Sequence, residues 1–366
     1  MTDEPAPTSD AGPESAPDSA LTVDYAVDGY WLREWHGPAT VRISSHGIRA
    51  IADAASPTAV RLPGVLLPGF RDSHVHLGLT EPRALIAGGL AAVDDLGGHP
   101  ERLHEWATDD AVPALAYAGA FITAHGGYPA NRIWAASLAV CEVSTGEQAV
   151  AAVAEQVSAG AILIKVALNS DDGPVIDDET LHAIVEYAHS RAAEVVAHVQ
   201  GAGQAQRAFA AGVDRLAHTP WTEKLSDALI EEMAQPNSRF LAGRHSWIST
   251  LDIHGYGQRG PDFERASDNL RRFHIAGGTV RYGTDMGNGD LPPGLNLREL
   301  TALQDAGVRG DALLLALCLP DFERTVSYLP TVPGPDADLA SWLMTATVVT
   351  ARKLLTPIPT TGRNHP

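Results

Sequence analysis

Cysteine is scarce in this chain of 366 residues. The two cysteines, Cys141 and Cys318, lie far apart and form no C-x-x-C pair. The sequence therefore indicates neither a disulfide scaffold nor a cysteine metal motif. Basic residues are also few, since 26 Lys and Arg stand against 45 Asp and Glu and give a net charge of −19. That balance argues against binding to nucleic acid or to an anionic membrane surface.

Long apolar runs are missing as well. No segment reaches the roughly 18 consecutive apolar residues that a membrane-spanning helix needs. Residues 1–20 carry five acidic residues, no basic residue and no apolar stretch, so we expect no secretory signal in them. We expect this segment to be a disordered acidic tail, and we expect the protein to be cytoplasmic.

The rest of the chain divides into two parts. Residues 21–67 alternate short strand-like pieces with turns, which predicts a small β domain. In residues 68–366, eight short apolar strands alternate with amphipathic segments such as "DDETLHAIVEYAHSRA". The pattern predicts an α/β fold, a (β/α)8 TIM barrel with a small, reduced N-terminal β layer. An open doubly wound sheet is the alternative, although no G-x-G-x-x-G follows a strand. Prolines near 318–341 predict a loop or lid insertion.

The first barrel strand carries an unusual set of polar residues in "PGFRDSHVHLGL". His74 and His76 are separated by one residue, so both side chains point to the same side of the strand and can chelate one ion. An isolated His-x-His pair is more often solvated or hydrogen bonded, so a metal site demands further ligands at the ends of other strands.

Lys165 stands within the apolar strand "ILIKVAL". A buried ammonium is costly without a partner. Three interpretations remain open: a buried ion pair, a catalytic amine, or a neutral amine that reacts with carbon dioxide to give an anionic carbamate able to bridge two metals.

Three further strand ends carry ligand-type residues, namely His198 in "VVAHVQG", His218 in "RLAHTPW" and Asp285 in "RYGTDMG". Each alone is a weak signal, because a single strand-end histidine is usually structural. Together with the first three they place four histidines, one lysine and one aspartate at the active-site face of one barrel. Imidazole and carboxylate ligands suit Zn²⁺, so we expect a metal site.

The ordered set resembles the amidohydrolase superfamily, in particular its binuclear branch with a carbamylated lysine, which holds imidazolonepropionase-like and prolidase-like proteins. The matching stretches include "LLPGFRDSHVHL", "GAFITAHGGYP", "ILIKVAL", "AGVDRLAHT" and "VRYGTDMGN" and cover about residues 66–288. The resemblance implies a hydrolase that cleaves a C–N amide bond with one or two zinc ions per chain.

The resemblance also implies a role for each ligand. His74 and His76 would bind the more buried metal, carbamylated Lys165 would bridge it to a second ion, and His198 and His218 would hold that ion. Asp285 would be both a ligand and the catalytic proton shuttle for an attacking, metal-bridging hydroxide. The chain departs from the family pattern after "ARKLLTPIPT", where the strands that complete the β layer are expected, so that layer would be reduced or borrowed from a partner.

Loop residues near these strand ends are candidates for substrate binding. They are His125, Tyr128, Arg244, His245 and Met286, with Asn288 and Trp247 nearby. An arginine here could hold a substrate carboxylate. Asp72, on the same strand face as His74, is predicted to orient a ligand, with an ordinary buried ion pair or hydrogen bond as the alternative.

The expected partner is a small-molecule or peptide substrate: a peptide, an N-acyl amino acid or a cyclic amide. One alternative is removal of a follower peptide in the maturation of a natural product, as in the bottromycin-type enzyme of the same superfamily. A second is a lyase that uses Lys165 to form a Schiff base, and a third is a non-catalytic metal-binding scaffold. The sequence leaves open whether copies of the chain form a homo-oligomer.

Overall fold

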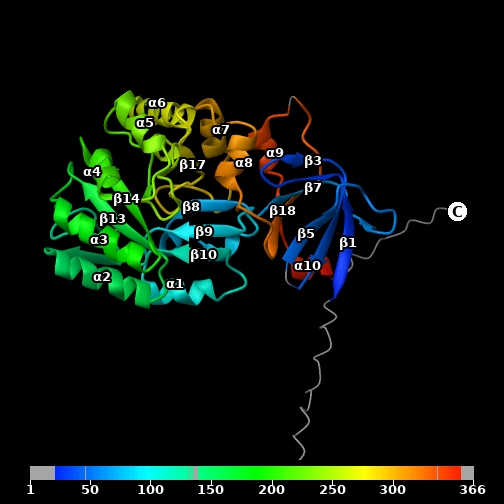
Figure 1. The fold of residues 1–366 in the computed structure, drawn as a ribbon, viewed down its shortest axis with the longest axis horizontal. Coiled ribbons are helices and arrows are strands. Elements are labelled where there is room, and N and C mark those ends of the chain that lie inside the picture. The colour runs from blue at the N-terminus through cyan, green and yellow to red at the C-terminus, as the bar shows by residue number, and fades with distance from the viewer. Residues whose placement is uncertain are drawn as a thin grey trace, which may run out of the picture.

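The structure is a computed structural model that describes residues 21–355 except 46, 131, 134, 136–138 and 336. The expected acidic tail, residues 1–20, lies outside the described residues. The chain forms a large α/β part and a smaller β part that lie side by side (Figure 1). Within the described residues, no helix is both long enough and apolar enough to cross a membrane.

The smaller part consists of two sheets. The first has the strand order β5-β4-β1-β6, with bounds Gly47–Ala52, Ala39–Ser44, Thr22–Val27 and Val60–Arg61. The second has the order β19-β18-β7-β2-β3, with bounds Thr347–Thr350, Thr325–Leu329, Val65–Pro68, Gly29–Trp31 and Trp35–His36. A separate apolar cluster, which includes Tyr25, Val41, Ile43, Leu66 and Val326, packs in this part.

Residues 325–355, the last described stretch of the chain, belong mostly to this β part as well. Strand β18 pairs antiparallel with β7, and Ser327 Oγ accepts a hydrogen bond from the backbone N–H of Phe70 at 3.0 Å. The short helices α9 (Leu339–Leu343) and α10 (Ala351–Leu355) follow, and Tyr25 donates its hydroxyl to the Leu354 carbonyl at 2.6 Å. The stretch 318–341 was expected to be a loop or lid, but it contains β18 and the start of α9. Two C-terminal strands therefore join a layer that was expected to be reduced.

The larger part is built on parallel strands. A three-stranded sheet has the order β10-β9-β8, with bounds Ala114–Tyr117, Ala92–Asp95 and Arg71–Val75. A seven-stranded sheet has the order β12-β11-β13-β14-β15-β16-β17, with bounds Val140–Val143, Phe121–Ala124, Leu163–Asn169, Glu194–Gln200, Arg215–Leu216, Ser246–Ile248 and Thr279–Arg281. All of these strand pairs are parallel, which confirms the expected parallel α/β class.

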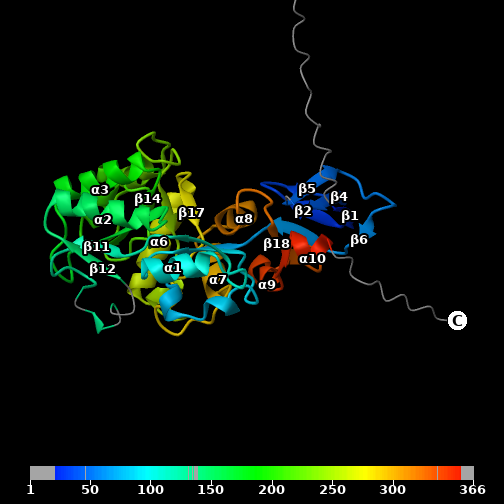
Figure 2. The ribbon, with the colours of Figure 1, turned by 90° about the horizontal axis from the view of Figure 1, so that it is seen from below.

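Helices connect most of the strands, and they cover the outside of the sheets (Figures 1 and 2). They are α1 (Pro100–Ala107), α2 (Gly146–Ser158), α3 (Asp178–Ser190), α4 (Gln204–Ala211), α5 (Asp227–Ala234), α6 (Pro261–Ile275), α7 (Leu297–Asp305) and α8 (Asp311–Leu317). Helix α3 begins as its sequence predicts, because the Asp177 side chain accepts from the backbone N–H of Thr180 and acidic residues fill the first turn.

Hydrogen bonds also link the two sheets at both of their junctions. At one junction, the Ser73 N–H donates to the Tyr282 carbonyl at 2.9 Å, and the His76 N–H donates to the Met286 carbonyl at 2.7 Å. At the other, the Ile162 N–H donates to the Tyr117 carbonyl at 3.2 Å. The strand β8 thus lies beside the segment that follows β17, although some 200 residues separate them in the sequence.

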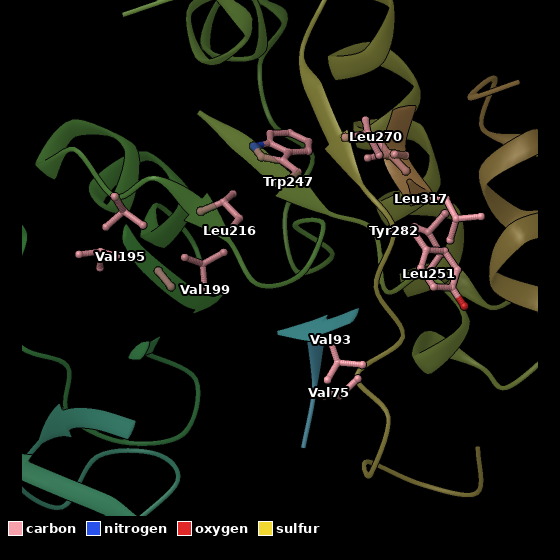
Figure 3. Packing of buried hydrophobic residues seen from close by; sticks show 14 of the residues in the cluster. Val75, Val93, Val195, Val199, Leu216, Trp247, Leu251, Leu270, Tyr282 and Leu317 are labelled. Atoms are coloured by element: carbon pink, nitrogen blue, oxygen red, sulfur yellow. The ribbon is translucent and has the colours of Figure 1, made fainter. Parts of the chain in front are cut away.

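The core packs between the strands and the surrounding helices (Figure 3). Trp247 of β16 is fully buried and stacks on Phe273 of α6, with ring centroids 4.0 Å apart. Each such large apolar side chain contributes about 1.5–3 kcal/mol on burial. This packing fixes the strands, and the strand ends in turn position the polar residues described next.

Candidate metal centre

The six predicted ligands lie around one cavity of about 380 Å³. His74 is on β8 and His76 directly follows it, Lys165 is on β13, and His198 is on β14. His218 follows β15, and Asp285 follows β17. None of the six is more than 7% exposed. The structure therefore brings together all six side chains that the sequence singled out.

Asp285 is the carboxylate at the centre of this group. Its Oδ1 atom lies 3.0 Å from His74 Nε2 and 3.2 Å from His76 Nε2. The potential ligand atoms of His74, His218 and Asp285 all lie within 4.8 Å of one another. Such a spacing allows three donor atoms to face one ion.

Hydrogen bonds orient three of the histidine rings. His74 Nδ1 lies 2.8 Å from the Ala217 carbonyl and His76 Nδ1 lies 3.2 Å from the Gly97 carbonyl. Because a carbonyl only accepts, these Nδ1 atoms carry the proton and leave Nε2 as a bare donor atom for a metal. His218 Nδ1 is bonded to Thr250 Oγ1 at 3.0 Å.

His198 has a ring nitrogen that could bind a group in this cavity. Its Nε2 atom is buried and has no hydrogen-bond partner among the described residues. A buried polar atom without a hydrogen-bond partner is costly, and a ligand bound to this nitrogen would remove that cost. A metal ion is a suitable partner for an imidazole nitrogen in such a setting.

Burial keeps three of these histidines, His74, His198 and His218, neutral. It lowers the pKa of His74 to about 4 and that of His198 to about 3, and it lowers the pKa of His218 well below its ordinary value. For Asp285, burial acts to raise the pKa, but the neighbouring histidines outweigh it and hold the pKa well below its usual range. Neutral imidazoles and an ionised carboxylate are the forms that bind a divalent cation.

Lys165 is 1% exposed, and burial lowers its pKa to about 7 against the opposing charges of Asp285 and Asp95. Its Nζ atom lies 3.5 Å from His74 Nε2 and 5.6 Å from the centre of the Phe121 ring. Within the part of the chain that the structure describes, no carboxylate comes within 4.0 Å of this nitrogen. The buried ion pair considered for Lys165 is therefore not formed, and a neutral amine is accessible near pH 7.

Asp72 is hydrogen bonded to two segments that carry proposed ligands. Its carboxylate accepts from the His74 N–H at 3.0 Å, the Thr284 N–H at 3.1 Å and the Thr284 hydroxyl at 2.6 Å. It thus connects the strand of His74 to the residue that precedes Asp285, as the predicted orienting role requires.

Only part of the predicted substrate-binding set reaches the cavity. Tyr128 lines it and stacks on His198, with centroids 4.9 Å apart, while Met286 is buried beside β8. His125, Arg244, His245 and Met286 are not among the described residues that line it. His125 is exposed and pairs with Glu142 at 3.2 Å. His245 precedes β16, so it lies at the opposite end of the strands from the cavity, and its Nδ1 atom donates to the Val213 carbonyl.

Several other cavity residues carry no separate signal in the sequence. They are Leu79, Phe121, Gln200, Trp221, Ile253 and His254. Trp221 follows His218 by three residues, and that proximity is the one signal that could have identified it. His254 lies in a short 3₁₀ turn (Asp252–His254), where no strand periodicity points to the cavity.

No family model and no curated protein matches the sequence. Solved structures do match it. The putative prolidase from Bifidobacterium longum is 20% identical, with a TM-score of 0.71 over 90% of this chain and 93% of that one. The A. niger ochratoxinase is 19% identical, with a TM-score of 0.72 over 91% and 95%. A Xaa-Pro dipeptidase with bound methionine is 17% identical, with a TM-score of 0.71 over 90% and 98%. At these identities the likeness establishes architecture, so this chain has the fold of those three proteins.

Proposed function

We propose that the chain is a metal-dependent hydrolase of the amidohydrolase superfamily that cleaves a C–N amide bond. The observation that carries the proposal is the meeting of six ligand-type side chains in one cavity, where His198 Nε2 has no partner among the described residues. The structural neighbours support this assignment, since a protein described as a putative prolidase and a Xaa-Pro dipeptidase have the same fold.

We take the eight strand units that begin with β8 to be a (β/α)8 barrel, in which β10 continues into β11 and β12 lies outside the ring. The hydrogen bonds that link β8 to the segment after β17, and β10 to the start of β13, support closure. In such a barrel the active site lies at the C-terminal strand ends, which is where the six side chains lie. An open doubly wound sheet would not need those linking bonds.

One or two zinc ions would be held by the histidines and Asp285. His74, His76 and Asp285 would hold the first ion, while His198 and His218 would hold the second. When bound, zinc supplies Lewis-acid polarisation of a carbonyl and lowers the pKa of water. The donor set fits zinc because it combines neutral imidazole nitrogens with a carboxylate oxygen.

Lys165 would join this set as a carbamate. Its neutral amine would add to the carbon of carbon dioxide and release one proton, which would leave an anion with two oxygens. Burial, the absence of a paired carboxylate among the described residues and a pKa lowered to about 7 all favour this reaction.

Asp285 would move the proton during hydrolysis. Its Oδ1 atom faces the histidines, and its Oδ2 atom accepts from Asn288 Nδ2 at 2.9 Å, so one oxygen is directed to the reaction and the other is held. The carboxylate would accept a proton from the attacking water and deliver it to the leaving nitrogen. The carbonyl carbon gains the water oxygen, the C–N bond breaks, and the products are a carboxylic acid and an amine.

Metal analysis and the variant Asp285→Asn test the proposal. The purified chain should contain up to two divalent ions, lose activity on amides with a chelator and regain it with Zn²⁺. Asp285→Asn should reduce kcat by about 10²–10⁴-fold. Asp290→Asn is the matched control, since Asp290 is exposed in the same loop and does not line the cavity. Full activity without metal would refute the proposal, and trapping of a substrate on Lys165 by borohydride would favour the Schiff-base alternative.

A further inference from the structure

A substrate carboxylate buried in the cavity would favour a cationic side chain on the wall. The described wall offers none outside the proposed ligands. Outside the six proposed ligands, the described lining residues are aromatic, apolar, amide-bearing or glycine, apart from one histidine. None of them is a lysine or an arginine. Residues 131, 134 and 136–138, in the loop that follows Tyr128, are not described, and the sequence places no lysine or arginine there either.

Neither Arg132 nor Arg244 offers a free cation to the cavity. Arg132 lies over the Tyr128 ring, 5.9 Å from its centre, and its guanidinium is ion-paired with Asp172. Arg244, which could have held a carboxylate, is exposed and is not a lining residue. A carboxylate buried in this cavity would therefore have to rely on neutral groups outside the metal site, and that is costly.

The histidine on the wall, His254, suits a neutral ligand. His254 Nε2 is buried and has no hydrogen-bond partner among the described residues, so it can pair with a polar substrate atom. Burial lowers the pKa of His254 to about 4, which leaves the ring uncharged at neutral pH. It offers a hydrogen bond and no positive charge.

Two aromatic side chains flank the ligand histidines. Tyr128 stacks on His198, while Trp221 meets His198 and His218 edge-on, with centroids 5.6 and 5.5 Å apart. Trp221 also lies 4.9 Å from the His254 ring at an angle of 33°. Flat side chains on both flanks favour a flat group in the substrate, because offset stacking adds to the area buried.

We infer that the substrate is a small, electrically neutral amide with a planar ring, and not a peptide or N-acyl amino acid with a free carboxylate. This inference rests on the proposed function. The cavity of about 380 Å³ suits a molecule of that size. The chain's net charge of −19 further disfavours the approach of anions.

Matched anilides test the charge preference. Methyl 4-acetamidobenzoate and 4-acetamidobenzoate share the same scissile acetyl–nitrogen bond and nearly the same shape, but only the second is an anion. Release of the aromatic amine by the zinc-loaded protein reports cleavage of that bond alone. We expect kcat/KM to be at least about tenfold higher for the neutral ester, a difference of about 1.4 kcal/mol. Equal values, or a higher value for the anion, would overturn the inference.

A binding measurement makes the test independent of turnover. Calorimetric titration of the zinc-loaded Asp285→Asn protein, in which turnover is expected to be slow, with the same two compounds should give a lower Kd for the neutral one. Tighter binding of the anion, or no binding of either compound at millimolar concentration, would contradict the inference. If the neutral compound binds better but no amide of any charge is hydrolysed, then the proposed function fails while the ligand class stands.

Variants at Trp221 test the planar group. Trp221→Leu should raise the Kd of the neutral anilide several-fold, and Trp221→Phe should restore most of the affinity because it retains a ring. Trp106→Leu is the matched control, since Trp106 lies on α1 and does not line the cavity. Unchanged affinity in Trp221→Leu, or equal loss in the Phe and Leu variants, would contradict stacking at this position.

Discussion

Arg215 offers a direct test of what holds the parallel strands together. It begins β15 and is 6% exposed, and its Nη1 atom lies 2.8 Å from Asp94 of β9. Its Nη2 atom is ion-paired with Glu194 at the start of β14. Burial acts to lower the pKa of Arg215, but the charges of Asp94 and Glu194 outweigh it and raise the pKa. One guanidinium thus neutralises two carboxylates from two other strands.

The variant Arg215→Met keeps an unbranched side chain of similar length and removes the charge. The Asp94 side chain is 1% exposed, and among the described residues its remaining ion pair would be with Arg71, whose Nε atom lies 3.6 Å away. Removal of one partner from a buried ion pair costs about 3–5 kcal/mol, because the other charge stays buried without full compensation. We expect the free energy of unfolding to fall by that amount.

Urea unfolding, followed by tryptophan fluorescence and circular dichroism, measures the effect. The double variant Arg215→Met with Asp94→Asn should recover a large share of the lost stability, since a neutral amide then replaces the buried Asp94 carboxylate that lost its partner. Arg83→Met is the control, because the Arg83–Asp109 pair is exposed and its removal should change little. A loss below about 1 kcal/mol for Arg215→Met, or no recovery in the double variant, would refute the reasoning.

Three further predictions concern single side chains. Lys165→Ala should lose bound zinc by elemental analysis, and formate or acetate should restore part of it; full retention of zinc would exclude a carbamate ligand. Asn288→Ala should lower kcat about tenfold while metal content persists, because Asp285 Oδ2 loses its hydrogen bond; an unchanged kcat would show that this bond is dispensable. Burial raises the pKa of Glu299 from 4.5 to about 7, so the folded chain favours the protonated carboxyl. The stability that Glu299 contributes is therefore present below about pH 4.5 and is lost as the pH rises through 7. In urea unfolding between pH 4.5 and 8, the free energy of unfolding of the wild-type chain should fall by roughly 3 kcal/mol more than that of Glu299→Gln. A difference between the two proteins that stays constant with pH would contradict the raised pKa.

The ligand set could be predicted because each member interrupts or ends an apolar strand. His74, Lys165 and His198 occupy positions where a buried strand would otherwise hold an apolar residue, so their polarity alone marks them. Parallel strands then bring their C-terminal ends to one face. The local sequence pattern and the parallel topology together were sufficient to predict that these residues meet. The roles assigned to them are proposals.

Two other expectations were wrong because periodicity does not fix a strand's ends or its partners. The strand in "GRHSWIST" is Ser246–Ile248, so His245 lies at its N-terminal end and packs against Phe209 and Phe240 as a core histidine. The segment Thr325–Leu329 is flanked by prolines and was taken for part of a loop or lid. It forms a strand through pairing with Val65–Pro68, some 260 residues away, and no local pattern reveals such pairing.

The position of Asp285 is determined by its neighbours to an unusual degree. Its backbone has a φ of +55°, a left-handed conformation that costs a non-glycine residue about 1–2 kcal/mol. The residue before it is bonded to Asp72, and the Met286 carbonyl after it accepts from the His76 N–H. Gly287 completes the turn, since a Cβ there would come within 2.8 Å of the His76 carbonyl. Both flanks of Asp285 are thereby fixed to the strand segment that carries the two proposed histidine ligands. Strain maintained in this way at a cavity is typical of a functional site, and it holds the carboxylate beside its histidine neighbours across more than 200 residues of chain.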